Sequence, residues 1–253
     1  MKRLIIILTL FVIVLNCCYA AASKTVTTDY KIVTKDGFSM TAKLEYPRIK
    51  NKKDFSTVVL LHSLGYNSQW WGNLPENLLE KGYAVLLVDL RGHGNSIYNS
   101  KLSKVSWKSM KNKAFSKYPS DVITVINYIK DDNKKIFFNN YAFVGSDIGA
   151  VTAILTANEI SNKPKTIVML SPIIQTKGLY APVKFAELDN IDILSIIGTS
   201  DIDGEKTNNY LKKFAQSTYA QYSSTSKSTG MLMLKHDESL SNVIVEWIEQ
   251  YLK

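Results

Sequence analysis

The stretch Val144-Gly145-Ser146-Asp147-Ile148-Gly149-Ala150 decides the fold of this 253-residue chain. The apolar run Tyr141–Val144 predicts a buried strand just before it, and Ala150–Ile160 predicts a helix directly after it. Where a strand turns sharply into a helix, the backbone passes close to its neighbours, and glycine suits such positions. Gly145 and Gly149 stand on either side of the turn. The stretch therefore indicates a strand–turn–helix unit of an α/β protein.

The rest of the chain alternates short apolar runs with amphipathic segments of helix length. Thr25–Tyr46 predicts an opening β-hairpin with its turn at Lys35, Asp36 and Gly37. Further buried strands are predicted over Thr57–Leu61, Ala84–Val88, Thr166–Leu170, Ile193–Ile197 and Met231–Leu234. Helices are predicted over Leu74–Lys81, Ser120–Asp131 (with Ser120 as its cap), Thr207–Ser217 and Leu240–Leu252. This order predicts one domain with a mostly parallel sheet, helices on both faces, and active groups at the carboxyl ends of strands.

The first residues have the pattern of an export signal. Basic residues precede the apolar run Leu4–Leu15, and the small residues Ala20–Ala22 follow it, which predicts a signal peptide over residues 1–22 and a single domain over residues 23–253. Cleavage after Ala20 would leave 233 residues. In the alternative, Cys17 or Cys18 is lipidated and anchors the chain. Both interpretations predict an exported protein, periplasmic or secreted.

Composition excludes several classes. With 45% hydrophobic and 21% charged residues, the chain is too apolar to be disordered. Both cysteines lie in the leader, so disulfide scaffolds, cysteine nucleophiles and thiolate metal sites are not expected in the mature chain, and no metal is predicted. No later run is long enough for a multi-span membrane protein.

The charge balance favours anionic surfaces. The formal charge of +9 becomes +7 without Lys2 and Arg3. The densest basic cluster, between Lys101 and Lys117, carries no nucleic-acid motif, so a solvated surface is favoured and no nucleic-acid partner is predicted. Membrane-surface association through the lysines or a lipid anchor stays open, as does the oligomeric state.

Motifs at four strand ends resemble those of the α/β-hydrolase superfamily, especially its dienelactone-hydrolase-like and esterase-like members. Leu61-His62-Ser63-Leu64-Gly65 resembles the oxyanion loop, with His62 in a structural role. Asp89-Leu90-Arg91-Gly92-His93-Gly94-Asn95-Ser96 resembles a fold-marking turn whose charged residues form a structural cluster. Gly145–Gly149 resembles the nucleophile elbow, and Gly198-Thr199-Ser200-Asp201 resembles the turn that carries the acid.

The resemblance covers nearly the whole mature chain and implies an α/β-hydrolase fold without a cap domain, because only about twenty residues, 171–190, are available for one. Counting inward from the two glycines places Asp147 at the apex of the elbow. The implied catalytic set is Asp147, His236 and Asp201, with Asp203 as a second acid, Ser146 as an alternative nucleophile, and the backbone N–H groups of Leu64 and Ile148 as the oxyanion hole.

An aspartate at the apex changes the chemistry. A serine attacks an ester carbonyl after histidine takes its proton, whereas a carboxylate attacking acyl carbon would form an anhydride. Haloalkane dehalogenases and epoxide hydrolases, which this arrangement resembles, use aspartate on saturated carbon. We therefore predict a cofactor-free hydrolase of small ester-like or alkyl electrophile substrates. The alternative is a catalytically inactive pseudohydrolase that acts as a binding protein for a small molecule.

Overall fold

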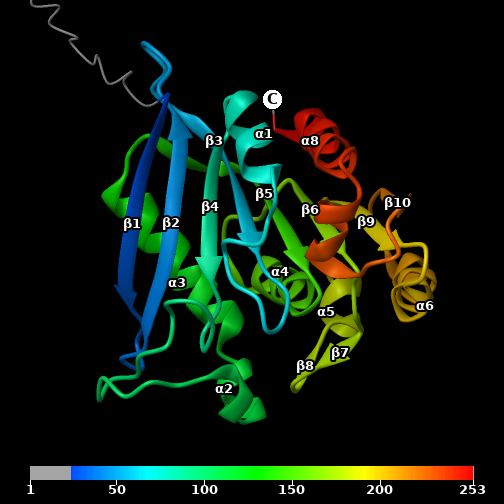
Figure 1. Cartoon of the computed structure of the whole chain (residues 1–253), viewed down its shortest axis with the longest axis horizontal. Helices are drawn as coiled ribbons and strands as arrows, with labels where there is room; N and C mark the ends of the chain where they lie inside the picture. Colours follow the sequence, from blue (N-terminus) through cyan, green and yellow to red (C-terminus); the bar gives the residue numbers. More distant parts are fainter. Residues whose placement is uncertain (1–23, 253) are drawn as a thin grey trace, which may run out of the picture.

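The computed structural model describes residues 24–252, so the predicted leader lies outside the described residues. One sheet runs through the molecule in the strand order β1-β2-β4-β3-β5-β6-β9-β10 (Figure 1). The strands β1 and β2 are antiparallel to each other, β2 is antiparallel to β4, and all later pairs are parallel. The strands are β1 (Thr25–Val33), β2 (Ser39–Pro47), β3 (Phe55–Leu61), β4 (Ala84–Asp89), β5 (Ile136–Ser146), β6 (Thr166–Leu170), β9 (Asp192–Gly198) and β10 (Tyr219–Ser224).

Helices cover both faces of this sheet. Neighbouring residues of a strand point to opposite faces, and Val59 and Leu61 of β3 accordingly join one buried cluster while Val58 and Leu60 join the other. The first cluster packs against α3 (Tyr118–Asp132), α4 (Ile148–Glu159) and α5 (Pro182–Ala186). The second packs against α1 (Leu74–Glu80), α7 (Met233–His236) and α8 (Leu240–Tyr251). The domain is therefore a three-layer α/β structure, as the sequence predicts.

Shorter elements lie mainly at the carboxyl edge of the sheet, which is the lower edge in Figure 1. A small hairpin of β7 (Gln175–Thr176) and β8 (Leu179–Tyr180) follows β6, and α6 (Ile202–Leu211) follows β9. The helix α2 (Asn112–Phe115) lies between β4 and α3. Within residues 24–252, single 3-10 turns occur as η1 (Trp107–Ser109), η2 (Lys212–Phe214) and η3 (Gly230–Leu232). Among the described residues, no helix has the length and apolar character needed to cross a membrane.

Most predicted elements are confirmed, and the one predicted with the wrong type of structure lies near the C-terminus. The predicted strand Met231–Leu234 is wrong: these residues form η3 and the start of α7, and Met231, Met233 and Leu234 are buried beside α1 and α8. The last strand is β10, which the sequence analysis missed. The predicted cap Ser120 is also wrong, because α3 begins at Tyr118. The predicted helix Thr207–Ser217 begins earlier, at Ile202, and ends at Leu211.

Two buried histidines connect the loop after β3 to the turn after β4. His62 Nε2 accepts the Leu90 N–H at 2.9 Å, so its Nδ1 carries the proton and donates to the Ser63 carbonyl at 2.8 Å. His93 Nε2 accepts the Gly65 N–H at 3.0 Å. Burial lowers the pKa of both histidines to about 4. Both rings are therefore neutral near pH 7, and their structural role is confirmed.

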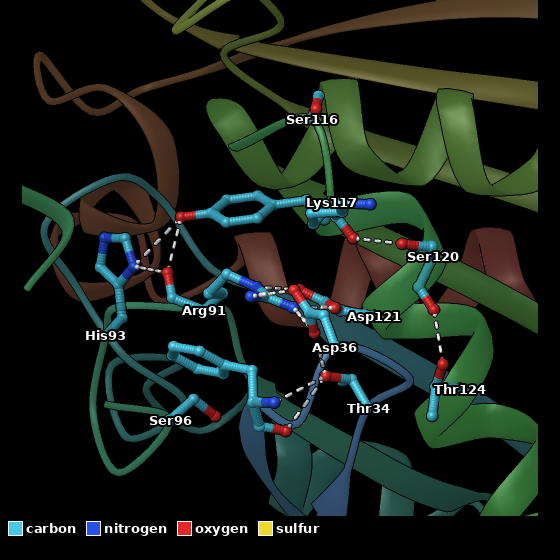
Figure 2. Close-up of polar contacts among 12 residues, drawn as sticks. Thr34, Asp36, Arg91, His93, Ser96, Ser116, Lys117, Ser120, Asp121 and Thr124 are labelled. Carbon is cyan, nitrogen blue, oxygen red and sulfur yellow. Dashed lines mark hydrogen bonds and ion pairs between the residues drawn. The ribbon is translucent and has the colours of Figure 1, made fainter. Parts of the chain in front are cut away.

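Arg91, in the turn after β4, binds two carboxylates from other parts of the chain. Its guanidinium group binds both oxygens of Asp121 at 2.7 Å and both oxygens of Asp36 at 2.9 Å, as Figure 2 shows. The Arg91 side chain is only 7% exposed and lies over the ring of Phe38. Hydrogen bonds from Arg91 hold the pKa of Asp36 well below its usual range, although burial opposes this. The ion pairs connect the β1–β2 hairpin, the turn after β4 and helix α3.

Replacing this arginine tests how much the network contributes. We expect Arg91→Ala to lower the free energy of unfolding by about 3–5 kcal/mol, because it leaves the buried Asp121 carboxylate without its partner. Urea titration followed by circular dichroism measures the change. The matched control is Arg48→Ala at an exposed site, for which we expect a change below about 0.5 kcal/mol. Equal effects of the two substitutions would contradict the role given to Arg91.

Candidate active site

The turn between β5 and α4 places Asp147 alone at its apex. Asp147 has φ 53° and ψ −117°, a backbone conformation that side-chain-bearing residues rarely adopt. A Cβ atom on Gly145 would lie 2.5 Å from the Gly149 carbonyl oxygen, and one on Gly149 would overlap the Leu61 carbonyl oxygen. Both glycines are required by close backbone packing. The geometry is that of the elbow which the sequence predicts.

The Asp147 carboxylate lies against the loop that follows β3. Its Oδ2 atom accepts the Leu64 N–H at 3.2 Å. Burial raises the pKa of this carboxyl group, and the charge of Asp201 raises it further, whereas the N–H groups of Leu64 and Ile148 lower it. Leu64 and Ile148 are the two residues whose N–H groups were predicted to form an oxyanion hole. In the structure these N–H groups act on the Asp147 side chain itself.

Asp201 lies across the same cavity, at the end of β9. It caps helix α6, where its Oδ1 atom accepts the Gly204 N–H at 2.9 Å. Its Oδ2 atom is buried and has no hydrogen-bond partner among the described residues. The structure therefore brings the predicted acid into the vicinity of Asp147, with one carboxylate oxygen unused.

A cavity of about 190 Å³ joins these groups at the carboxyl edge of the sheet. Its polar lining consists of carboxyl and hydroxyl side chains, and no lysine, arginine or histidine side chain of residues 24–252 lines it. The polar members are Ser63, Tyr66, Asp147, Ser171, Asp201, Asp203 and Thr229. No group of three His, Cys, Asp or Glu side chains that could hold a metal ion occurs among the described residues. The site is acidic and can bind hydrogen-bond donors.

The structure does not bring His236, the predicted catalytic histidine, to the cavity that contains Asp147 and Asp201. This histidine is the last residue of α7, it is exposed, and it is not among the residues that line the cavity. The neighbouring Asp237 faces inward instead, where its carboxylate accepts the Ser224 hydroxyl at 2.8 Å and the Thr225 N–H at 3.0 Å. Because α7 also buries Met233 and Leu234, its outward side is left to Lys235 and His236.

The alternative nucleophile Ser146 is also not placed for catalysis. It is completely buried behind the turn, and its Oγ atom is 2.6 Å from the Ser63 Oγ atom. Ser146 does not line the cavity that contains Asp147. Of the aromatic residues in the loop after β3, Trp71 is buried in the core, and Trp70 packs against Tyr66, which lines the cavity. Tyr180 lines a separate groove with α5.

Thr229 is a cavity residue that no sequence motif predicts. This residue lies in the loop that follows the last strand, β10, and it lines the cavity with Asp147 and Asp201. The next residue, Gly230, has φ 57°, and its N–H donates to the Ser171 Oγ atom at 2.7 Å, which fixes the loop against the end of β6. Recognising β10 as the last strand would have pointed to the loop after it, which contains Thr229. Because Met231–Leu234 is predicted as the last strand, the sequence places the expected histidine at His236 instead.

Comparison with known proteins supports a hydrolase. The chain is 28% identical over 163 residues to "Probable lipase C14C8.15" of Schizosaccharomyces pombe, an alignment that covers 59% of this chain and 35% of that protein. The chain therefore spans about a third of the length of this relative. The esterase Pf2001 of Pyrococcus furiosus superposes with a TM-score of 0.68 at 16% identity, covering 90% of this chain and 91% of that one. The dienelactone hydrolase of Anabaena variabilis gives 0.66 at 15% identity, covering 90% and 99%.

These two structures show the same fold across most of the chain. The match to a protein family is more specific, because residues 52–219 fit the sequence model of the family described as Serine aminopeptidase, S33. That range contains more than half of the chain and includes the loop after β3, the turn at Asp147 and the cap Asp201. The chain belongs to the Serine aminopeptidase, S33 family and has the α/β-hydrolase fold.

Proposed function

We propose that this protein is a cofactor-free hydrolase that attacks saturated carbon through Asp147. The observation that carries the proposal is the position of the Asp147 carboxylate, which has one oxygen on the Leu64 N–H group and lines the cavity. The same arrangement disfavours acyl substrates. The N–H group that would stabilise the oxygen of an attacked carbonyl is already bound to a carboxylate, and attack by that carboxylate on acyl carbon would form an anhydride.

In the first step, the Oδ1 atom of Asp147 forms a bond to an electrophilic carbon. In an alkyl halide the carbon–halogen bond breaks and the halide departs with the bonding electron pair. In an epoxide the ring C–O bond breaks, and the ring oxygen, which stays on the product, takes a proton from solvent. The product is an alkyl ester of Asp147. The charge of Asp201 raises the pKa of Asp147, which shows that the two carboxylates repel each other. Forming the ester removes the negative charge of Asp147. The relief of repulsion favours the ester. Small alkyl halides and epoxides are suitable substrates for a cavity of about 190 Å³.

In the second step, water attacks the carbonyl carbon of this ester. The oxygen that becomes negatively charged is Oδ2, which already accepts the Leu64 N–H. His236 is exposed and outside the cavity, so we assign the base to Asp201, whose Oδ2 atom has no partner among residues 24–252. Asp201 takes the proton from water and returns it to the departing alkoxide, which leaves as an alcohol. Asp147 is left as a carboxylic acid, and it releases the second proton of the attacking water to solvent to regain its carboxylate.

Isotope labelling tests the nucleophile directly. In water enriched in heavy oxygen, a single turnover with an epoxide or alkyl halide should place the label in the Asp147 carboxylate, because water attacks the ester at that carbon. Mass spectrometry of the peptide containing Asp147 measures it. Asp147→Asn should lower the rate about 10⁴-fold or more and abolish the labelling. Label found only in the alcohol product would exclude Asp147 as the nucleophile.

The pH dependence tests the electrostatics. Because burial raises the pKa of Asp147, the rate of its alkylation should rise with pH, about tenfold per unit, until pH exceeds that pKa and the carboxylate form predominates. Removing a neighbouring negative charge with Asp201→Asn should move this rise to lower pH while slowing hydrolysis of the ester. Intact-mass spectrometry separates the two steps. An unchanged pH profile in Asp201→Asn would show that the carboxylates do not interact.

A second candidate is a binding protein that has lost catalysis. The observation that favours it is the absence of any imidazole among the described residues that line the cavity, where the loop after β10 presents Thr229. Such a protein would bind a small hydrogen-bond donor between Asp147 and Asp201 and would not be alkylated.

Restoring a nucleophile and a base tests this second candidate. If the cavity is that of a disarmed esterase, the double variant Asp147→Ser with Thr229→His should hydrolyse 4-nitrophenyl acetate, whereas the parent should not, because a hydroxyl and an imidazole would then face the same cavity. The matched control is Asp147→Ser with His236→Ala, which lacks an imidazole in the cavity. Ester hydrolysis by the parent that only Ser146→Ala abolishes would overturn both candidates.

We also propose that the protein is exported, on the basis of the leader pattern over residues 1–22, which lie outside the described residues. Lipidation of Cys17 or Cys18 is the alternative to cleavage after Ala20. The mature N-terminus, determined by mass spectrometry, distinguishes the two.

A further inference from the structure

A basic surface lies beside the cavity, at the carboxyl edge of the sheet. From Leu90 to Ser120 the sequence contains no aspartate or glutamate. The lysines of this segment are all exposed, as is the lysine of the β7–β8 hairpin. We call the following set the lysine face: Lys101, Lys104, Lys108, Lys111, Lys113, Lys117 and Lys177. No ion pair joins any of them to a carboxylate within residues 24–252.

Two segments far apart in sequence build this surface. The first follows the carboxyl end of β4 and includes α2, and the second is the β7–β8 hairpin after β6. They meet where the Lys177 Nζ atom lies 5.9 Å from the centre of the Phe115 ring and where Gly178 packs against Asn112. Both segments lie at the lower end of the molecule in Figure 1. The lysines therefore lie on two adjoining segments at the same edge of the sheet as Asp147.

The nearby acidic groups leave this face positive. Arg91 binds both Asp36 and Asp121 and offsets one of their two negative charges, which leaves at most one against the seven lysines. The carboxylates of Asp201 and Asp203 belong to the other side of the cavity, at the start of α6. The lysine charges are thus free to interact with an external anion.

The exposed side chain of Leu102 helps to identify the class of anion that the lysine face binds. Leu102 is 81% exposed and occupies a turn with φ 58°, between Lys101 and Lys104. Apolar side chains among lysines are typical of segments that enter the boundary of a lipid bilayer. Nucleic acid is less suitable, because one face of the Trp107 ring is already stacked on His93 at 5.6 Å and Phe115 is buried, so they offer no open platform for bases.

We infer that the lysine face binds an anionic phospholipid surface, with Leu102 inserted among the lipids. Electrostatic attraction supplies most of the binding, so affinity should fall as salt rises. The inference does not depend on the proposed reaction. Bound in this way, the protein would turn the edge of the sheet that carries Asp147 towards the membrane.

Vesicle sedimentation of the full chain tests this inference. Binding should be strong to phosphatidylcholine vesicles that contain phosphatidylserine, weak to phosphatidylcholine alone, and reversed by salt. The triple variant Lys101→Gln, Lys104→Gln and Lys108→Gln should weaken binding about a hundredfold, at about fivefold per lysine. Leu102→Ser should weaken binding with little change in its salt dependence. Binding of the lysine triple variant that equals binding of the parent would show that another part of the chain, such as the leader, causes binding, and would overturn the inference.

A matched control removes the same charge from the opposite edge. Lys50, Lys53 and Lys134 are exposed and precede β3 and β5, so they lie at the amino edge of the sheet. Replacing these three by glutamine should leave vesicle binding within about twofold of the parent. Equal losses in the two triple variants would show that net charge, and not this face, causes binding. Equally tight, lysine-dependent binding to a duplex oligonucleotide would also overturn the assignment to lipid.

Discussion

The site depends on the backbone conformation of one residue, Asp147. A positive φ at an aspartate costs about 1–3 kcal/mol, so the surrounding structure has to hold it there. The Asp147 N–H donates to the Leu170 carbonyl of β6, the Asp147 carbonyl accepts the Ala150 N–H of α4, and the Asp147 carboxylate accepts the Leu64 N–H. Hydrogen bonds to three elements thus compensate the strain. They also place a carboxylate at the head of a helix and at the edge of a cavity.

The site combines negative charge inside with neutral histidines behind it. His62 and His93 are neutral because burial lowers their pKa values to about 4, so they order the loop after β3 without offsetting the charge of Asp147. Asp201 adds to that negative charge. Any ligand or reaction that removes one negative charge, through alkylation, proton uptake or a bound hydrogen-bond donor, is therefore favoured by the same electrostatics. This property is common to both candidate functions.

Sequence patterns predicted the first half of the fold and the elbow, because strongly apolar strands and paired glycines leave few alternatives. Asp201 was found for the same reason, at the end of the apolar strand β9. The failure came at β10, whose residues Tyr219–Ser224 are largely polar, since an edge strand needs little burial. The apolar run Met231–Leu234 suggested a strand, but a short apolar run does not by itself distinguish a strand from a buried helical turn. The histidine expected after this predicted strand was therefore His236, which lies at the surface.

The direction of β1 determines which edge of the sheet lies next to the N-terminal leader. Because β1 runs parallel to β4, it begins at the amino edge of the sheet, at the end away from Asp147 and the lysine face. A lipid attached to the leader would therefore tether the domain by its far end and leave the cavity directed away from the anchoring bilayer. Release of the leader would free the domain to approach a bilayer with its cavity first. If the protein is exported as proposed, processing at the leader would determine which edge of the sheet faces a bilayer.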